Sequence, residues 1–111
     1  MTSYTRPMLT YLTWRMRAFP VRCWDEVDEE KRSLRHVAFD EDLDLFLAAA
    51  SLAETLAAKD DGGYSGAVAY DRRYGPVPEG PIPDVHDGAV PIPAEEFERM
   101  WRSARKARES A

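Results

Sequence analysis

The chain has 111 residues, of which 44% are hydrophobic and 32% charged, a composition typical of one soluble globular domain. No apolar run approaches the roughly 18 residues of a membrane-spanning helix, and the first residues lack the apolar core of a signal peptide. The single cysteine, Cys23, excludes an internal disulfide and suits a reducing compartment. We therefore expect one cytoplasmic domain over residues 1–111.

The net charge of −5 is unevenly distributed along the chain. Residues 1–22 hold four arginines and no acid, residues 25–61 hold twelve acids and four bases, and residues 99–108 hold five bases and no acid. This pattern argues against a nucleic-acid-binding footprint over the whole domain. It favours an acidic surface facing a basic partner, although the same acids could simply be solvated or cap helices.

Three strands joined as an antiparallel meander are the first predicted structure. Apolar and polar residues alternate in three runs, which Pro20 and a charged turn separate: 8–17, 21–27 and 33–39. Asp25 interrupts the apolar face of the second run. Residues 1–7, which precede the meander, are expected to be a flexible lead-in.

A long Ala/Leu-rich helix is predicted over residues 41–59, where apolar residues recur at helical spacing after a run of acids. Gly62 and Gly63 would end it. An alternative places a strand at residues 43–47 and begins the helix at an N-cap, Ser51, with Glu54 as its capping-box partner. A further run of alternating residues, 64–70, could form a fourth strand or an extended segment at the sheet edge.

Prolines dominate the next segment, residues 75–92, and exclude a helix or a central strand there. We expect an extended chain that its apolar residues hold against the core. A second, amphipathic helix is predicted over residues 93–108, because Pro93 suits a first helical position. Its apolar stripe has helical spacing and consists of Phe97, Met100, Trp101 and Ala104.

These elements predict an α+β fold. We expect an antiparallel sheet of three or four strands, packed by the long Ala/Leu-rich helix and by the C-terminal amphipathic helix. The residues expected in the core are Trp14, Val37, Phe39, Phe46, Leu47, Phe97 and Trp101.

Five short motifs follow one another along the chain: Trp14, Glu26-Val27-Asp28, Arg35-x-Val37-x-x-Phe39, Gly80-Pro81-Ile82-Pro83, and Ile92-Pro93-Ala94-Glu95-Glu96-Phe97-x-x-x-Trp101. Their order resembles a family of small, single-domain bacterial proteins with no assigned function. Members open with a tryptophan-bearing strand and close with an I-x-x-E-E-F-x-x-x-W helix. The helix expected at 41–59 departs from that pattern as an insertion. The resemblance implies the fold and a bacterial, cytosolic setting, and it implies no site residues.

Common catalytic motifs are absent from the sequence, which has no phosphate-binding glycine loop, no paired cysteines, no HExxH and no G-x-S-x-G. His36 and His86 lie far apart, and nothing in their spacing joins them to further metal ligands. Cys23 is expected to be a buried structural thiol, with strand parity placing it away from His36. We predict no metal and no cofactor, and the sequence leans towards a protein that is not an enzyme.

One face of the meander is a candidate ligand site. Its aromatic and charged residues could stack on and orient a small anionic or planar ligand: Tyr11, Arg15, Trp24, Glu26 and His36. Glu26 and His36 could also exchange a proton. Alternatively, a helix covers this face, or the face is solvated and carries only weak cross-strand pairs.

Acidic residues around two turns are a candidate partner-binding surface: Asp25, Asp28, Glu29, Glu30, Asp40, Glu41 and Asp42. Proteins that neutralise basic partners use such surfaces, and charge complementarity speeds their association. The sequence therefore predicts a non-enzymatic protein-interaction module, immunity-like or inhibitor-like. The alternative is a small-molecule-binding or accessory enzyme domain that uses the sheet face. A homodimer through an open face or edge is also expected to be possible, whereas a membrane or nucleic-acid partner is not expected.

Overall fold

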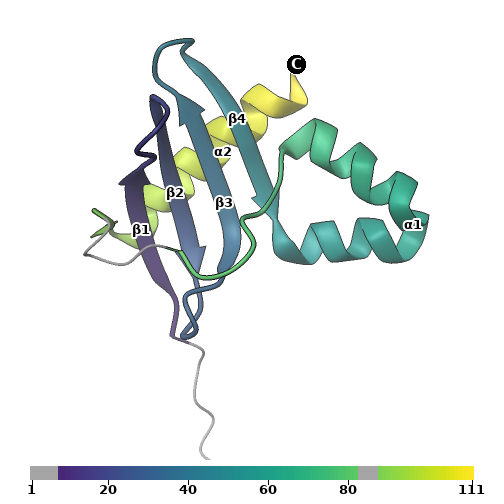
Figure 1. Cartoon of the computed structure of the whole chain (residues 1–111), viewed down its shortest axis with the longest axis horizontal. Coiled ribbons are helices and arrows are strands. Elements are labelled where there is room, and N and C mark those ends of the chain that lie inside the picture. Colours follow the sequence, from purple (N-terminus) through teal and green to yellow (C-terminus); the bar gives the residue numbers. More distant parts are fainter. Residues whose placement is uncertain (1–7, 83–87) are drawn as a thin grey trace, which may run out of the picture.

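A computed structural model describes residues 8–82 and 88–111 of the chain. Five strands form one antiparallel sheet in the order β4-β3-β2-β1-β5, accompanied by two helices (Figure 1). The α+β class is thereby confirmed, with one strand more than the sequence predicts. The predicted lead-in, residues 1–7, lies outside the described residues. The bounds are β1 Thr10–Arg15, β2 Val21–Val27, β3 Ser33–Asp40, β4 Leu45–Ser51, α1 Leu52–Tyr74, β5 Val90–Pro91 and α2 Ala94–Glu109.

The C-terminal helix α2 lies across one face of the sheet, which we call the helix-covered face (Figure 1). Its apolar stripe packs on the residues that alternate onto this side of the strands, including the neighbours Trp24 and Val37. Phe97 is fully buried at the centre of this core. Burial of a helical stripe on an alternating sheet face is the packing that the two periodicities predict.

The opposite face of the sheet, here the second face, is crossed by the extended chain that follows α1 (Figure 1). Ile82 of this chain is buried against Leu12 and Val27, and its amide donates a hydrogen bond of 2.9 Å to the carbonyl of Lys31. Gly75 begins the crossing at β4, where its φ of 79° lies in the left-handed region. Apolar residues between the prolines thus hold this segment to the sheet.

The helix predicted over residues 41–59 is wrong in its bounds. Residues 45–51 form β4, and the helix begins after Ser51, whose hydroxyl accepts a hydrogen bond of 3.3 Å from the amide of Glu54. The alternative, a strand followed by a helix capped at Ser51, is therefore correct in its order, but the strand runs over 45–51 rather than 43–47. The capping-box partner is wrong, because the amide of Ser51 donates to the hydroxyl of Tyr70 at 2.9 Å and not to Glu54. Asp40 does not cap a helix, because its Oδ1 accepts the amides of Asp42 and Leu43 in the β3–β4 turn.

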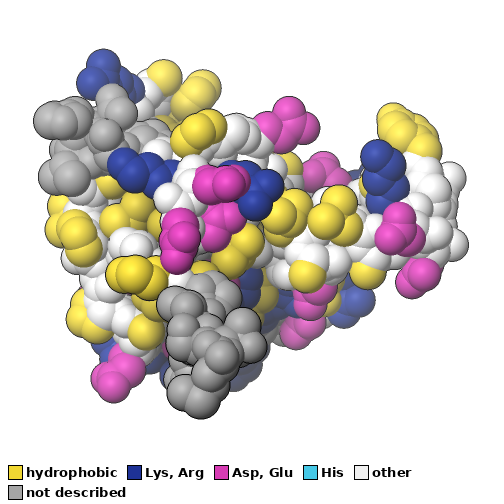
Figure 2. Space-filling view, turned by 90° about the horizontal axis from the view of Figure 1, so that it is seen from below, with side chains coloured by type: hydrophobic (Ala, Val, Ile, Leu, Met, Phe, Trp, Pro, Cys, Tyr) yellow, Lys and Arg dark blue, Asp and Glu magenta, His cyan; other side chains and the backbone are white. Residues whose placement is uncertain are grey.

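Helix α1 is bent at Gly63, whose φ of 59° and ψ of −145° are not helical. The glycine pair predicted to end the helix therefore only kinks it, and residues 64–70 are helical rather than a strand. The two halves form a hairpin that stands off from the body of the molecule as an arm (Figures 1 and 2). The helix contacts the sheet at the edge formed by β4 and β3, and no residue of α1 is buried there.

Two arginines of α2 fasten the base of this arm. Arg105 donates to the carbonyl of Ala49 at 2.8 Å and pairs with the carboxylate of Glu54. Arg108 donates to the carbonyls of Arg72 and Arg73, each at 2.9 Å, at the C-terminal end of α1. These two basic residues of the last helix therefore bind within the molecule. Neither described helix is long and apolar enough to cross a membrane.

Most of the predicted core residues pack in the interior, with Val37 and Phe97 fully buried. Leu47 is an exception, with 37% of its surface exposed. It is the extra residue of a β-bulge, because β3 pairs Ala38 with Ala48 but Phe39 with Phe46. A bulge re-aims the side chain that it inserts, which no alternation pattern anticipates.

Candidate functional site

The predicted ligand face is the helix-covered face, and its groups bind one another. The hydroxyl of Tyr11 donates to Glu26 at 3.0 Å, and the Tyr11 ring lies 5.3 Å from that of Phe97 between centroids. Trp24 is buried in the core beneath α2. Burial, followed by the hydrogen bond to Glu26, raises the pKa of Tyr11.

Glu26 is held by Arg35, whose Nε and Nη2 donate to its two oxygens at 2.9 and 2.8 Å. The same guanidinium donates to Glu98 of α2 and lies over the rings of Phe97 and Trp101, 4.9 and 5.1 Å from their centroids. Hydrogen bonding to Glu26 is the main cause that raises the pKa of Arg35. This face is therefore a closed network under a helix, with its charges already paired.

Two predicted ligand residues lie outside this network. His36 is on the second face, because β2 and β3 pair Asp25 with His36 and Trp24 with Val37. The prediction that His36 shares a face with Trp24 is wrong, since it depended on a register that the sequence does not fix. Arg15 lies at the end of β1, where it pairs with Glu41 at 2.7 Å.

A buried polar network centred on Asp25 occupies the second face. Asp25 is fully buried, and its Oδ1 lies 2.7 Å from Nδ1 of His36 and accepts a 2.7 Å hydrogen bond from the hydroxyl of Ser33. Its Oδ2 accepts the indole N–H of Trp14 at 2.8 Å. Asp25 is thus no part of an acidic surface, and its place on the apolar face of β2 was the sequence signal for this network.

The geometry assigns the tautomer of His36. A carboxylate only accepts hydrogen bonds, so Nδ1 carries a proton, and in the neutral ring Nε2 offers a lone pair. Among the described residues, no side chain or backbone group is bonded to Nε2, while no fully buried side-chain nitrogen or oxygen lacks a partner. Nε2 therefore reaches an accessible space.

That space is a cleft of about 390 Å³ on the second face, which we call the hairpin cleft. His36 lies at its floor beside Val21 and Ala38, and Asp40 contributes a carboxylate. The walls are apolar and come from three segments far apart in the sequence: Met16, Phe19 and Pro20 of the β1–β2 turn, Leu47 of β4, and Pro76.

The predicted acidic surface is divided between two ends of the sheet. The turn after β2 and the turn after β3 lie at opposite ends of β3 (Figure 1). In the first turn, Asp28 accepts the amides of Glu30 and Arg32 at 2.9 Å, and these backbone bonds chiefly lower its pKa. Figure 2 shows carboxylates and basic groups side by side on the face nearest this turn. The prediction of one continuous acidic surface is therefore wrong.

The other end of the sheet, the hairpin end, comprises residues 16–20 and 40–47. The amide of Glu41 donates to the carbonyl of Pro20 at 2.8 Å, which joins the two turns. Large apolar side chains are exposed here beside the carboxylates of the β3–β4 turn, with exposed fractions of 64%, 68%, 48% and 37% for Phe19, Leu43, Leu45 and Leu47. The sequence signal for this surface was the run of Leu43, Leu45 and Leu47, whose spacing instead predicts the apolar stripe of a helix.

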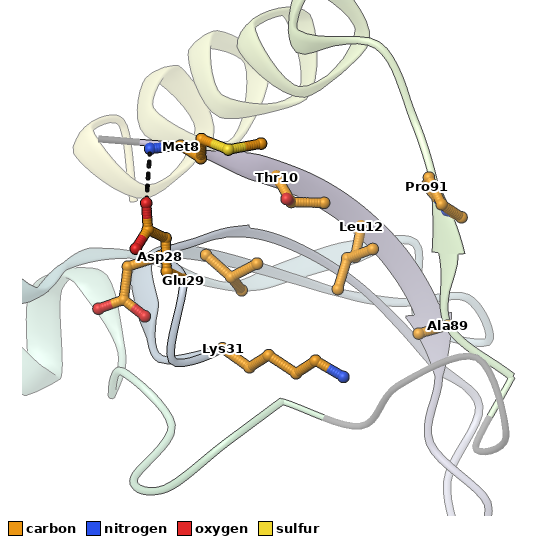
Figure 3. Close-up of a pocket in the computed structure, with 9 residues that line it drawn as sticks. Met8, Thr10, Leu12, Asp28, Glu29, Lys31, Ala89 and Pro91 are labelled. Atoms are coloured by element: carbon orange, nitrogen blue, oxygen red, sulfur yellow. Dashed lines mark hydrogen bonds between the residues drawn. The ribbon is translucent and has the colours of Figure 1, made fainter. Parts of the chain in front are cut away.

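A second cavity, of about 380 Å³, lies between the start of β1, β5 and the turn after β2 (Figure 3). Leu12, Ala89 and Pro91 give it apolar walls. The carboxylates of Asp28 and Glu29 already hold hydrogen bonds, since Asp28 binds the turn backbone and Glu29 accepts the amide of Met8 at 3.5 Å. The acids of this cavity therefore have few hydrogen-bonding atoms left to bind a ligand.

Cys23 lies on the second face, opposite Ala38, and so shares a face with His36, contrary to the parity prediction. It is fully buried, and burial, with a smaller effect of Asp25, raises the pKa of its thiol to about 12. A thiol of this kind is structural rather than nucleophilic. Within the described residues, no three His, Cys, Asp or Glu side chains form a group that could hold a metal ion, and His86 lies outside those residues.

Comparison of the chain with protein-family models, with curated proteins and with solved structures found no match. The resemblance to small bacterial proteins is thus carried by motifs alone. In the structure these motif residues stabilise the fold: Trp14 binds Asp25, and Glu26 pairs with Arg35 over the rings of Phe97 and Trp101.

Proposed function

We propose that this protein is a small cytosolic interaction module, immunity-like or inhibitor-like, that binds a basic protein partner through its hairpin end. The observation that carries the proposal is the combination of exposed apolar and acidic side chains at this end. The proposal keeps Asp40, Glu41 and Asp42 as partner-binding residues. It leaves out the acids of the opposite turn.

The apolar part of the surface provides the area that a partner would bury. Phe19 and Leu43 are each more than half exposed although they are large apolar residues. Leu45 pairs with Asp40 and Asp40 with Val21, so that these neighbours form one row on the second face. Contiguous exposed apolar side chains with a polar rim are typical of protein-binding sites.

The charge of the same surface favours a basic partner. Three arginines lie in or beside it: Arg17, Arg15, which is paired with Glu41, and Arg108, which donates to the carbonyl of Phe46 at 3.3 Å. The carboxylates outnumber these arginines and are Asp40, Glu41, Asp42 and Asp44. A local negative excess raises the rate at which a positively charged protein meets the surface.

The alternative, a ligand or enzyme site on the helix-covered face, has less support. Glu26 and Tyr11 are hydrogen-bonded within the molecule, and α2 occupies the space above them. A ligand would have to displace a helix whose Phe97 is fully buried.

Capture from the native cytosol with matched variants tests the proposal. The hairpin-end variant carries Asp42→Lys and Leu43→Ser, both at exposed turn positions. The control variant carries Glu29→Lys and Glu30→Lys, which reverse charges at the opposite end of the sheet. Quantitative mass spectrometry then compares the proteins bound by each, with low-salt and high-salt washes.

The proposal expects one basic protein, near stoichiometric, that wild type and the control variant retain at low salt and that the hairpin-end variant loses. It is contradicted if the hairpin-end variant retains that protein equally. It is also contradicted if only a second copy of this chain is captured, an outcome that sedimentation analysis would show as a homodimer.

A further inference from the structure

We infer that the hairpin cleft is a binding site for a free organic cation, an amine carried on a bulky apolar body. This inference goes beyond the proposed interaction with a protein and does not depend on it. The cleft shares Phe19, Leu47 and Asp40 with the hairpin end, so a bound amine and a protein partner would compete for these residues. It also relocates small-molecule binding from the helix-covered face to the second face of the sheet.

With its ring neutral, His36 presents a hydrogen-bond acceptor, Nε2, at the floor of the cleft. His36 is buried, with only 6% of its side chain exposed. Asp25 fixes the orientation of the ring by accepting a hydrogen bond from Nδ1. His36 lines the hairpin cleft, and among the described residues this cleft is the accessible space that Nε2 faces. A polar atom held in one orientation inside an apolar cleft is how binding sites orient a ligand.

A second acceptor lies at the rim. Oδ1 of Asp40 accepts the amides of Asp42 and Leu43, each at 3.0 Å, which leaves Oδ2 without a hydrogen bond in the described part of the chain. Among the residues that the structure describes, no lysine or arginine lines the cleft. An acceptor on the floor and a carboxylate at the rim, with no cation between them, suit a ligand that donates hydrogen bonds and carries positive charge.

The walls select for an apolar body. Met16, Phe19, Leu47 and Pro76 surround the space, and its volume of about 390 Å³ lies within the range of about 300–1,000 Å³ that small-molecule sites occupy. The side chain of a partner's lysine has the same donor chemistry, but its thin aliphatic stem would leave much of this volume empty. We therefore assign the site to a free amine.

The test uses tryptamine as the cationic probe and indole-3-acetate as a matched anion, followed by NMR of the backbone amides and of the His36 ring. Tryptamine is expected to shift His36, Val21 and Ala48, and to bind at least about tenfold more tightly than indole-3-acetate. Equal binding of the two probes, or no binding of tryptamine at millimolar concentration, would overturn the inference.

Two variants localise the binding. Asp40→Asn keeps an oxygen for the turn amides and removes the charge, so it should reduce the preference for tryptamine by about tenfold. Glu29→Gln changes the second cavity instead and should have no effect. The reverse result would place the amine in the second cavity and contradict the assignment.

A third probe separates the two sources of an amine. Acetyl-lysine-methylamide presents a lysine side chain as a protein partner would. Weaker binding of this probe than of tryptamine supports a free amine as the ligand. Tighter binding would show that the cleft receives a lysine of a partner, and the inference would be wrong.

Discussion

Nδ1 of His36 lies 2.7 Å from Oδ1 of Asp25, and both side chains are buried on the second face of the sheet. The pair joins adjacent positions of β2 and β3, and Ser33 and Trp14 complete the hydrogen bonding of the carboxylate. One buried acid thereby links three strand-borne donors and orients the imidazole at the floor of the hairpin cleft.

Replacing that acid should be strongly destabilising. Asp25→Ala leaves the donors of His36 and Trp14 without their acceptor, while the Ser33 hydroxyl keeps the carbonyl of Arg35 as an acceptor at 3.1 Å. The substitution is expected to lower the free energy of unfolding by about 3–5 kcal/mol, measured by urea denaturation. Trp14→Phe removes only one donor and should lower it by about 1–2 kcal/mol. A loss below about 1 kcal/mol in Asp25→Ala would contradict the central place of this network.

Two glycines with similar φ angles should respond differently to alanine. Both have positive φ, 79° for Gly75 and 81° for Gly80. A Cβ at Gly75 would lie 2.7 Å from the Cβ of Ala48 and 2.8 Å from the carbonyl oxygen of Leu47, whereas one at Gly80 would meet nothing. We expect Gly80→Ala to cost about 1–2 kcal/mol of unfolding free energy and Gly75→Ala about 3 kcal/mol or more. Equal losses in denaturant titrations would show that the chain does not cross β4 this closely.

The thiol of Cys23 should be inert in the folded protein. Burial raises its pKa to about 12, so the thiolate that reacts with iodoacetamide is scarce at pH 8. We expect no alkylation of native protein and complete alkylation in urea, followed by mass spectrometry. Rapid alkylation without denaturant would mean that the second face opens readily.

Acid should weaken the attachment of α2 to the sheet. The hydrogen bond from Arg35 is the main cause that lowers the pKa of Glu98. A carboxyl with a lowered pKa stabilises the fold above its unfolded pKa of about 4.3, and this contribution is lost as the pH falls through the folded value. Glu98→Gln should therefore reduce stability at pH 7 but flatten its decline below about pH 4. An unchanged acid limb in thermal unfolding would indicate that the pair contributes nothing.

Alternation and amphipathicity predict much of this fold. The meander and the C-terminal helix have the expected positions, because each has a regular period and is bounded by turn residues or prolines. The same reasoning fails for the stretch around Ala48, Ala49 and Ala50. All three are buried, so the run is apolar on both sides and its period cannot separate a strand from a helix.

The candidate sites were harder to predict because they depend on register and on bulges. Which side chains share a face with His36 follows from its pairing with Asp25, and the sequence alternation allows either pairing. The bulge at Leu47 directs that side chain into the hairpin cleft. The kink at Gly63 requires a backbone conformation that the glycine pair permits but that its sequence does not distinguish from a helix end.

The most direct test of the proposed interaction is the association rate of the captured basic partner as a function of ionic strength. Steering by the hairpin end predicts that the rate falls about tenfold or more from low to high salt, and that Asp42→Lys slows association at low salt while Glu30→Lys does not. A rate that stays flat with salt, or that Glu30→Lys slows as much as Asp42→Lys, would contradict the assignment of binding to the hairpin end.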